Sequence, residues 1–596
     1  MPDTDTDFDS LPDCIDRCPL DGTKVKPGRC GCGIPDNLPH CRLPTPTPEL
    51  TATPTPTATP PPPAAALVVT STGDEPDALA GDGRCQTATG VCTLRAAVQE
   101  ANARRGFDRI RVPAGTYPLA RGPIEIRDGA SLQGAGRDAT VVDAGGLAPV
   151  LYVAPESALA ISDLTLRNGR SSQREGAGGV VNEGTLDMRN CDIRDNSATF
   201  DGGTGGMINR GQATLVGSGV LSNSSTNTGG LTNTGTLTLY RTALTDNRGG
   251  RYGAALRNLG TAEVVTCELR GNIVFGPADA ALYNAAHGRL RIRTSRIVDS
   301  LAAAALHNVD GEVVVERTVI AGNSDGGIAN YNEFGAAGTV TVTESRIEGN
   351  GSLYGGAFGG LSNTGTVNVT ASSITGNLSA SNGGGLLNSG VMTIVNSTIS
   401  GNQTGYLGGG ISNAGTLELQ HVTIAENRSG VGFSPNATGG GLVNASGSSL
   451  RIARSIIAGN VDESGTAPDC RGTVESVGAN ILGDSFGCDW PSGAGDLADV
   501  DARLGPLDFY GAPTKSHAVF DNSPAIDAAG PAGKDHCAAS DQRGIPRPQG
   551  AECDIGAFEA TRDCGNGRVD GLERCDLGAG QEFVLHPDVP VRGGVR

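Results

Sequence analysis

Charged side chains and histidines are the groups through which this chain could act chemically on a bound molecule. Hydrolysis of a glycosidic bond, for example, needs two carboxylates that face one groove. Asp192, Arg194 and Asp195 lie close together, but this combination does not recur in the neighbouring repeats. The seven histidines are scattered, at His40, His287, His307, His421, His517, His536 and His586. The charged residues therefore do not mark an active site in the sequence.

Two of the histidines lie in neighbouring repeats. His287 follows the asparagine that marks its repeat, whereas His307 precedes the equivalent asparagine. Since the two would lie on different sides of that asparagine, we interpret them as a chance pair of solvated loop residues. With only four lysines in the chain, any further basic role falls to arginine.

An acidic, Cys-rich stretch opens the chain and offers oxygen ligands for a hard cation. Alternating carboxylates supply the ligands that Ca²⁺ prefers. The run from residue 5 to residue 19 resembles a thrombospondin type-three calcium repeat, although Phe8 and Ser10 stand where that family has glycine. The alternative interpretation is a solvated acidic tail. The resemblance implies calcium ligands at Asp5, Asp7, Asp9 and Asp13.

Aromatic residues are the candidates for binding. Within residues 178–460, six of them fall in one kind of loop, the loop before each Gly-Gly pair: Phe200, Tyr252, Phe275, Tyr354, Tyr406 and Phe433. If these loops are equivalent bends, their rings line one edge of the molecule. They could stack on sugar rings or on a protein partner, because an aromatic ring offers a large apolar face at a low ordering cost. The alternative is that each ring packs under its own loop.

These loops belong to a sequence repeat that organises the chain. The repeated phrase is Gly-Gly-apolar-x-Asn, then a glycine, an alternating apolar run and apolar-x-x-Asn. A repeat of about this length indicates stacked structural units. The first asparagine of each unit is Asn182, Asn209, Asn233, Asn258, Asn284, Asn308, Asn330, Asn363, Asn388, Asn413 or Asn444.

The spacing inside each unit predicts short strands. Leu231 is followed by apolar residues six, eight and thirteen places later, and Leu417, Leu419 and Ile424 hold the same places after Ile411. The step from six to eight has the two-residue period of a strand. The pattern resembles a right-handed parallel β-helix of the pectin-lyase-like type, and its phrases resemble the repeats of polymorphic outer-membrane proteins. In such a fold, side-chain amides of equivalent asparagines can bond to one another.

Composition limits the compartment and the partners. A formal net charge of −19 argues against nucleic acid as a partner. No apolar run is long enough to span a membrane. Cysteines in close pairs predict disulfides and an oxidising, extracellular or cell-surface location. The pairs expected in the flanks of the repeat are Cys85 with Cys92, Cys470 with Cys488, and Cys537 with Cys553.

Six segments follow along the chain. They are an acidic calcium-repeat-like module (1–42), a Thr/Pro-rich linker (43–66), an N-terminal cap (67–105), the β-helix (106–460), a C-terminal cap (461–560), and the start of a Cys-rich repeat with a tail (561–596). The run from Cys92 to Asn102 resembles the CSLREA domain, whose helix would cover the first coil. Four ordered motifs between Leu504 and Glu559 resemble the choice-of-anchor Q domain, which would close the last coil.

These observations predict a non-catalytic, secreted or surface-attached rod that adheres to or binds glycans or a protein partner. The alternative is a polysaccharide lyase or glycoside hydrolase that acts on an acidic glycan. We expect a monomer with no cofactor other than calcium in the N-terminal module. The start Met-Pro-Asp-Thr-Asp lacks the signal peptide that secretion requires, so we expect that the true N-terminus is missing.

Overall fold

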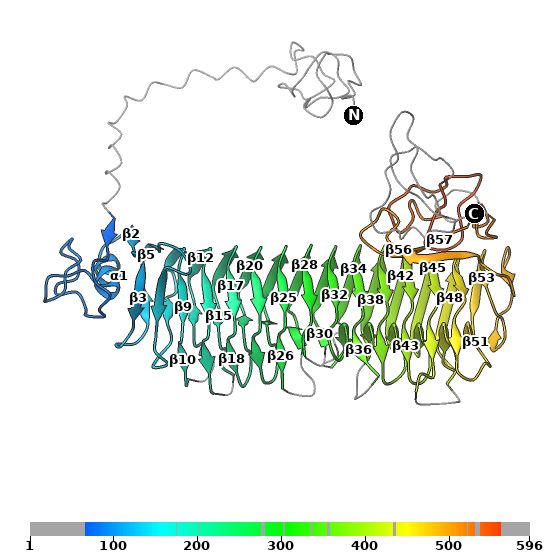
Figure 1. The fold of residues 1–596 in the computed structure, drawn as a ribbon, viewed down its shortest axis with the longest axis horizontal. Coiled ribbons are helices and arrows are strands. Elements are labelled where there is room, and N and C mark those ends of the chain that lie inside the picture. Colours follow the sequence, from blue (N-terminus) through cyan, green and yellow to red (C-terminus); the bar gives the residue numbers. More distant parts are fainter. Residues whose placement is uncertain are drawn as a thin grey trace, which may run out of the picture. The chain divides into compact units, whose positions relative to one another are not determined.

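The described part of the chain is a right-handed parallel β-helix, so the predicted fold class is confirmed (Figure 1). The computed structural model describes residues 66–561, apart from residues 174–175, 201, 276–279, 302–303, 334, 336–337, 354–357, 433–436, 521 and 531–536. Chain segments pair in parallel with the segments one coil earlier and one coil later. Each coil is therefore a layer that buries its apolar face only through its neighbours.

One face of the rod is a fifteen-stranded sheet. Most of its strands are three residues long, because the Gly-Gly pair before them and the loop after Asn limit the extended segment. Its strands are β4 (Ile124–Ile126), β7 (Leu151–Val153), β11 (Val180–Asn182), β15 (Met207–Asn209), β19 (Leu231–Asn233), β23 (Leu256–Asn258), β27 (Ala280–Asn284), β30 (Ala304–Val309), β33 (Ile328–Tyr331), β37 (Leu361–Asn363), β41 (Leu386–Asn388), β44 (Ile411–Asn413), β47 (Leu442–Asn444), β51 (Cys470–Thr473) and β54 (Cys488–Asp489).

The rest of each coil forms a second, bent sheet. Its long arm contains β1 (Leu67–Val68), β2 (Phe107–Arg111), β5 (Gly129–Gln133), β8 (Ala158–Ser162), β12 (Thr185–Arg189), β16 (Gln212–Val216), β20 (Thr236–Tyr240), β24 (Thr261–Val265), β28 (Arg289–Arg293), β31 (Glu312–Glu316), β34 (Thr339–Thr343), β38 (Thr366–Thr370), β42 (Val391–Ser400), β45 (Thr416–Ala425), β48 (Ser449–Ala453) and β52 (Glu475–Gly478). At the bend one residue adopts a left-handed conformation, such as Asn190 with φ 51°.

The short arm follows the bend. It contains β3 (Gly115–Pro118), β6 (Thr140–Asp143), β9 (Thr165–Arg167), β13 (Asp192–Arg194), β17 (Gly219–Leu221), β21 (Ala243–Thr245), β25 (Glu268–Arg270), β29 (Arg296–Val298), β32 (Val319–Ala321), β35 (Arg346–Glu348), β39 (Ser373–Thr375), β49 (Ile456–Ala458), β53 (Ile481–Leu482) and β55 (Leu497–Ala498). Strands β42 and β45 run through the bend and serve both arms. Parallel pairing thus continues to Ala498, beyond the end of the repeat expected at residue 460.

Short two-residue strands form two further small sheets at the edge that leads back to the fifteen-stranded sheet. The first contains β10 (Arg170–Ser171), β14 (Ser197–Ala198), β18 (Ser224–Ser225), β22 (Arg248–Gly249) and β26 (Ile273–Val274). The second contains β36 (Gly351–Ser352), β40 (Leu378–Ser379), β43 (Gln403–Thr404), β46 (Arg428–Ser429) and β50 (Val461–Asp462). The coils of β30 and β33 have no such strand among their described residues.

The core consists of columns of apolar side chains that run along the rod. The pairing register aligns Leu237, Ala262, Leu290, Val313, Val340, Val367, Met392, Leu417 and Leu450 in one column. All of them are buried. This confirms the predicted register, which placed the residue six places after the first apolar position inside the rod.

Two ladders of asparagine amides run parallel to these columns. In the first, each Nδ2 donates to the Oδ1 of the next asparagine, for example from Asn363 to Asn388 and from Asn388 to Asn413, both at 2.8 Å. The second ladder includes the bond from Asn402 to Asn427 at 2.8 Å and ends on the carboxylate of Asp469. The repeated asparagines are therefore structural, as their recurrence in nearly every coil predicted.

The N-terminal end is covered by the only helix among the described residues, α1 (Leu94–Ala103). Thr93 caps it by accepting a hydrogen bond from the Ala96 amide at 3.0 Å. The helix buries its apolar side against β2, β4 and β5. The buried Glu100 carboxylate accepts bonds from Gly81 and Gly83 in the preceding loop, which the Cys85–Cys92 disulfide closes. The predicted cap helix is thus present where the open first coil needs cover.

Residues 502–561 form a C-terminal lobe that lies along the side of the rod instead of closing its last coil (Figure 1). They include the antiparallel pair β56 (Leu504–Asp508) and β57 (Ser516–Val519). The expected position was wrong because polar groups on β42 and β45 bind the lobe. Asn396 donates to the Ser540 carbonyl at 2.7 Å, and Thr398 donates to Gln542 at 2.6 Å.

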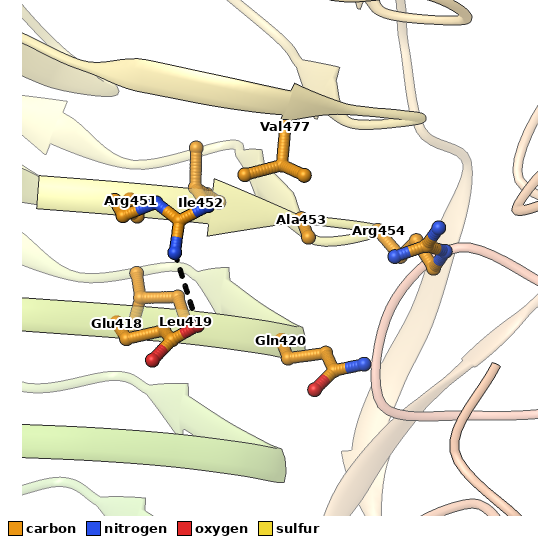
Figure 2. A pocket seen from close by; sticks show the side chains of 8 residues that line it. All are labelled: Glu418, Leu419, Gln420, Arg451, Ile452, Ala453, Arg454 and Val477. Carbon is orange, nitrogen blue, oxygen red and sulfur yellow. Dashed lines mark ion pairs between the residues drawn. The ribbon is translucent and has the colours of Figure 1, made fainter. Parts of the chain in front are cut away.

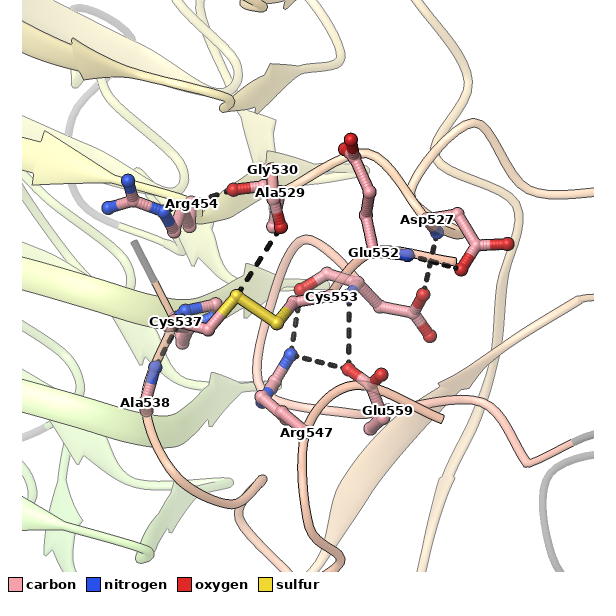
Figure 3. The surroundings of a disulfide bond; sticks show 12 residues. Arg454, Asp527, Ala529, Gly530, Cys537, Ala538, Arg547, Glu552, Cys553 and Glu559 are labelled. Carbon is pink, nitrogen blue, oxygen red and sulfur yellow. Dashed lines mark hydrogen bonds and ion pairs between the residues drawn. A yellow bond between two sulfur atoms is a disulfide. The ribbon is translucent and has the colours of Figure 1, made fainter. Parts of the chain in front are cut away.

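Inside the lobe, a buried ion pair and a disulfide replace the regular ladders (Figure 3). Arg547 donates to Glu559 at 2.9 Å, and neither side chain is exposed. Cys537 pairs with Cys553, and Cys470 pairs with Cys488 near the end of the rod. All three expected disulfides are therefore present. Such bonds fit an oxidising compartment.

Two of the described cysteines form no disulfide. Cys191 and Cys267 are buried free thiols, as their distance of several coils predicted, and burial raises the pKa of both, to about 12 and about 11. No helix in residues 66–561 is both long and apolar enough to cross a membrane.

Candidate functional site

The fifteen-stranded sheet changes in its middle. A Gly-Gly pair precedes most strands of this sheet, and a Cβ at Gly179 would lie 2.4 Å from the Gly206 carbonyl oxygen of the next coil. Two alanines take these places at β23, β27 and β30, and at β27 and β30 they are part of the strand. Strands β27 and β30 thereby lengthen to five and six residues, whereas β23, which also follows two alanines, keeps three. The sheet is therefore most extended over these coils.

Four ring side chains lie side by side on the outward side of this part of the sheet. We call Tyr252, Tyr283, His307 and Tyr331 the aromatic row. Tyr252 and Tyr283 have ring centroids 5.4 Å apart, Tyr283 and His307 5.4 Å, and His307 and Tyr331 4.9 Å. All three contacts are edge-to-face, an arrangement that ring quadrupoles favour. The row therefore connects four successive coils, β23, β27, β30 and β33.

The row crosses the sheet obliquely. Tyr283 and His307 are directly paired in register. Tyr252 precedes β23 on the loop side, whereas Tyr331 ends β33 on the other side. His307 is only 8% exposed, while the three tyrosines are half-buried. The rings thus form a fixed ridge whose tyrosines remain partly open to solvent.

Arginines accompany one end of the row. The guanidinium of Arg257 lies 4.1 Å from the centroid of the Tyr252 ring, and that of Arg251 lies 5.9 Å from it. Arg257 is in register with Tyr283 on the neighbouring strand. A cation over a ring face is attracted by the ring quadrupole. These contacts hold Tyr252 in place and give this end of the row a positive charge.

The loops at the edge of the row are short. Residues 299–303 connect β29 to β30, and residues 322–327 connect β32 to β33. By comparison, residues 376–385 connect β39 to β41 and include the short strand β40. His307 and Tyr331 therefore belong to coils with short connections at this edge.

The structure describes four of the six aromatic residues singled out in the sequence. Phe200, Phe275 and Tyr406 follow the short strands β14, β26 and β43, so they lie on one edge of the rod as expected. They are 51%, 72% and 46% exposed. Tyr252 follows β22 and packs on Tyr283 instead. Outside the described residues lie Tyr354, Phe433 and the four candidate calcium ligands Asp5, Asp7, Asp9 and Asp13.

His307 corrects the sequence interpretation of the histidines. It lies on strand β30 and is buried between two tyrosines, whereas a solvated loop residue was expected. His287 is exposed in a left-handed turn, as expected. The available signal was positional, because Tyr283 and His307 both stand one place before the marker asparagine of their coils.

Within the cluster of Asp192, Arg194 and Asp195, Asp192 has a structural role. Asp192 is bound by Arg137 at 3.0 Å, and Arg137 also donates to Asn190 at 2.6 Å and to the Gly217 carbonyl. Arg137 thus connects coils across the bend. Burial raises the pKa of Asp192, and the Arg137 charge opposes that shift. In the described ranges, no three His, Cys, Asp or Glu side chains are arranged so that they could hold a metal ion.

A Ser–His pair lies under the C-terminal lobe. The Oγ of Ser400 is 2.8 Å from Nε2 of His517, and Nδ1 of His517 is 2.8 Å from the Gly505 carbonyl oxygen. Only an Nδ1–H can bond to that carbonyl, so Nε2 accepts from the serine. Both side chains are buried, and burial lowers the pKa of His517. We interpret the pair as a connection between lobe and rod, since a substrate could not reach it.

Comparison with known proteins finds distant structural likenesses only. No protein-family model and no curated protein matches it. The A-module of mannuronan C-5 epimerase AlgE6 from Azotobacter vinelandii is 14% identical, covers 68% of this chain and 94% of its own, and has a TM-score of 0.32. The pectate lyase Pel9A is 15% identical over 83% and 97% of the two chains, with a TM-score of 0.23. A rhamnogalacturonan lyase is 11% identical over 76% and 96%, with a TM-score of 0.19.

At these identities and scores the likeness concerns the β-helix fold, and it carries no argument about activity. The resemblances to the CSLREA, choice-of-anchor Q and outer-membrane repeat families stay predictions from sequence.

Proposed function

We propose that the protein is a non-catalytic, extracellular rod that binds a polysaccharide chain across the aromatic row. The observation that carries this proposal is the series of ring contacts from Tyr252 to Tyr331, which covers four coils of one outward face. At the strand spacing of about 4.8 Å, four coils extend over about 14 Å. That length accommodates more than one sugar unit.

The chemistry of the row suits a sugar chain. Tyrosine combines an apolar ring with a polar tip, and the faces of sugar rings combine C–H groups with peripheral hydroxyls. The edge-to-face contacts fix the rings before a ligand arrives, which lowers the ordering cost of binding. The exposed rings of Phe200, Phe275 and Tyr406 on the adjacent edge would extend the contact for a long polymer.

Binding of a panel of neutral and acidic polysaccharides, on a glycan array and by affinity electrophoresis, tests the proposal. Tyr283→Ala and Tyr331→Ala should each weaken binding at least about fivefold, because an aromatic contact is worth about 1 kcal/mol. Tyr152→Ala is the matched control. Tyr152 holds the register position of Tyr283 earlier in the same sheet and bonds to Glu183 at 2.6 Å. Equal losses in all three variants, or no loss in either row variant, would refute the role of the row.

One observation supports the enzyme alternative, a lyase or glycoside hydrolase. His307 is a potential acid or base, and it lies between two tyrosines within the row. Prolonged incubation with the same polysaccharides, followed by assays for new reducing ends and for unsaturated uronate, distinguishes the two functions. Turnover that His307→Gln abolishes, with binding retained, would overturn the non-catalytic proposal.

Calcium binding by the N-terminal module is a separate proposal that rests on the sequence. Deletion of residues 1–41 should abolish calcium uptake measured by calorimetry and leave the melting of the rod unchanged. Undiminished uptake by the shortened chain would place the calcium elsewhere.

A further inference from the structure

A hollow lies on a different face from the aromatic row, at the N-terminal end of the long arm. It has a volume of about 330 Å³ and lies over β2, β5, β8 and β12. Register places Arg111, Gln133, Ser162 and Arg189 in one row across these strands. The adjacent row is Arg109, Ser131, Ala160 and Asp187. We call this hollow the basic groove.

Small side chains create the groove. Ser131, Ala160 and Ser162 form its floor between the long arginines of β2 and the residues of β12. Strands β2 and β12 are three strand spacings apart, about 14 Å. The groove is therefore open along the rod, and its floor offers hydroxyl groups from Ser131 and Ser162 and an amide from Gln133.

On the described strands of the long arm, every outward arginine except Arg109 and Arg111 forms an ion pair with a carboxylate. Arg289 pairs with Glu312 at 3.6 Å, and Arg291 pairs with Glu316 at 2.7 Å. The other pairs are Arg293 with Glu263, Arg189 with Asp187, and Arg451 with Glu418 and Glu475.

Arg109 and Arg111 have no such partner among the described residues, and both are exposed. The contrast is clearest at the hollow around Arg451, where Glu418 neutralises the guanidinium (Figure 2). The groove thus has two uncompensated positive charges in a chain whose net charge is −19.

An aromatic ring completes the set. Besides Arg109 and Arg111, the outward residues of β2 include Phe107, which is 57% exposed. Its ring lies against Gly129 of the next strand, where an added Cβ would approach the ring to 3.0 Å. The glycine therefore lets the ring lie over the sheet. One strand thus presents an exposed ring and two free guanidinium groups on the same face.

We propose that the basic groove binds a carboxylate-bearing polysaccharide. Arginine forms paired, charge-assisted hydrogen bonds with carboxylates. The hydroxyl and amide groups of the floor match sugar hydroxyls, and Phe107 offers a surface for a sugar ring. Dense polyanions such as nucleic acids are disfavoured, because the rest of this acidic chain repels them. This site does not depend on the aromatic row, which lies on the other sheet.

The test measures binding of the full-length protein to polygalacturonate and to its methyl ester, in the presence of a chelator that prevents calcium bridging. The variant Arg109→Gln/Arg111→Gln removes the two free guanidinium groups. The matched control, Arg289→Gln/Arg291→Gln, removes two arginines with the same spacing on the same face, but ones that already have glutamate partners. Circular dichroism and melting curves check that both variants fold.

The groove variant should bind polygalacturonate about tenfold more weakly for each guanidinium group removed, whereas the control should bind almost as tightly as the wild type. Binding of the wild type should also weaken as salt screens the charges. The proposal is overturned if the groove variant binds like the wild type, if the control is weakened as much, or if the methyl ester binds as tightly as the acid. Because Tyr283→Ala leaves the groove intact, failure of the groove and failure of the aromatic row are distinguishable.

Discussion

Truncating one asparagine in the middle of the first amide ladder tests how the coils are held together. Asn388 is fully buried, and its Nδ2 donates to Asn413 at 2.8 Å and to the Thr416 carbonyl at 3.0 Å. Its Oδ1 accepts from Asn363 at 2.8 Å and from the Gly390 amide at 3.2 Å. Asn388→Ala removes these bonds and leaves groups on both neighbouring coils without one of their partners.

The expected cost follows from counting those groups. A net hydrogen bond is worth about 1 kcal/mol, so Asn388→Ala should lower the free energy of unfolding by about 2–4 kcal/mol. Asn182 begins the ladder. It donates to Asn209 at 2.7 Å, but its Oδ1 has no partner among the described residues. Asn182→Ala should therefore cost about 1 kcal/mol less than the change at Asn388.

Urea unfolding monitored by circular dichroism gives the comparison, and hydrogen exchange identifies the coils that loosen. A third variant separates the ladder from the local turn. Asn388→Asp keeps the acceptor but places a carboxylate oxygen against Oδ1 of Asn413, in a fully buried site. It should destabilise the rod more than alanine does. Equal stability of the Asn182 and Asn388 alanine variants, or tolerance of aspartate, would show that the amide ladder does not hold the coils.

Three further outcomes follow from the packing. Leu417→Asp should prevent folding, because it buries a charge in the apolar column, whereas Thr393→Asp on the outward side of β42 should change the melting temperature little. Glu559→Gln should leave Arg547 buried without its counter-charge, cost about 3–5 kcal/mol and make the lobe sensitive to proteases while the rod resists. Burial raises the pKa of Asp469 from 3.8 to about 6. The contribution of Asp469 to folding stability is therefore complete below about pH 4 and is lost as the pH rises through about 6. Hydrogen exchange around β51 and β54 should accordingly be slower at pH 5 than at pH 7, after correction for intrinsic rates.

The rod could be predicted from sequence because its physics is local and repeated. The spacing of Leu231, Leu237, Leu239 and Leu244 fixes which side chains face inward, and the next coil repeats it. Each coil thus gives independent support for the same register. The C-terminal lobe has no such repeat. Its position depends on single contacts, such as Thr398 with Gln542, between residues 144 positions apart, and no sequence pattern indicates that pairing.

The aromatic row was missed for a different reason. Searching for aromatic residues within loops found Tyr252 and the exposed rings, but it excluded Tyr283 and Tyr331 because they belong to strands. The contacts of Tyr283 and Tyr331 with His307 depend on the alignment of coils of unequal length. In addition, His307 was considered as a titratable group and not as an aromatic ring. Counting ring residues by distance from the marker asparagine would have brought Tyr283 and His307 together.

Both proposed binding sites lie where the regular pattern of the rod is broken. A stacked repeat needs only its inward columns and ladders for stability, so outward residues are free to vary. On the described strands of the long arm, the outward residues are mostly uncharged or form ion pairs. Arg109 and Arg111 are the exceptions, because they are charged and form no ion pair with a described residue. On the fifteen-stranded sheet, alanines replace Gly-Gly at β23, β27 and β30, and the rings of Tyr283 and His307 meet over the last two of these strands. A departure that adds nothing to the columns or the ladders has no structural purpose that we can identify. Departures of this kind are where a repeat protein is expected to carry its function.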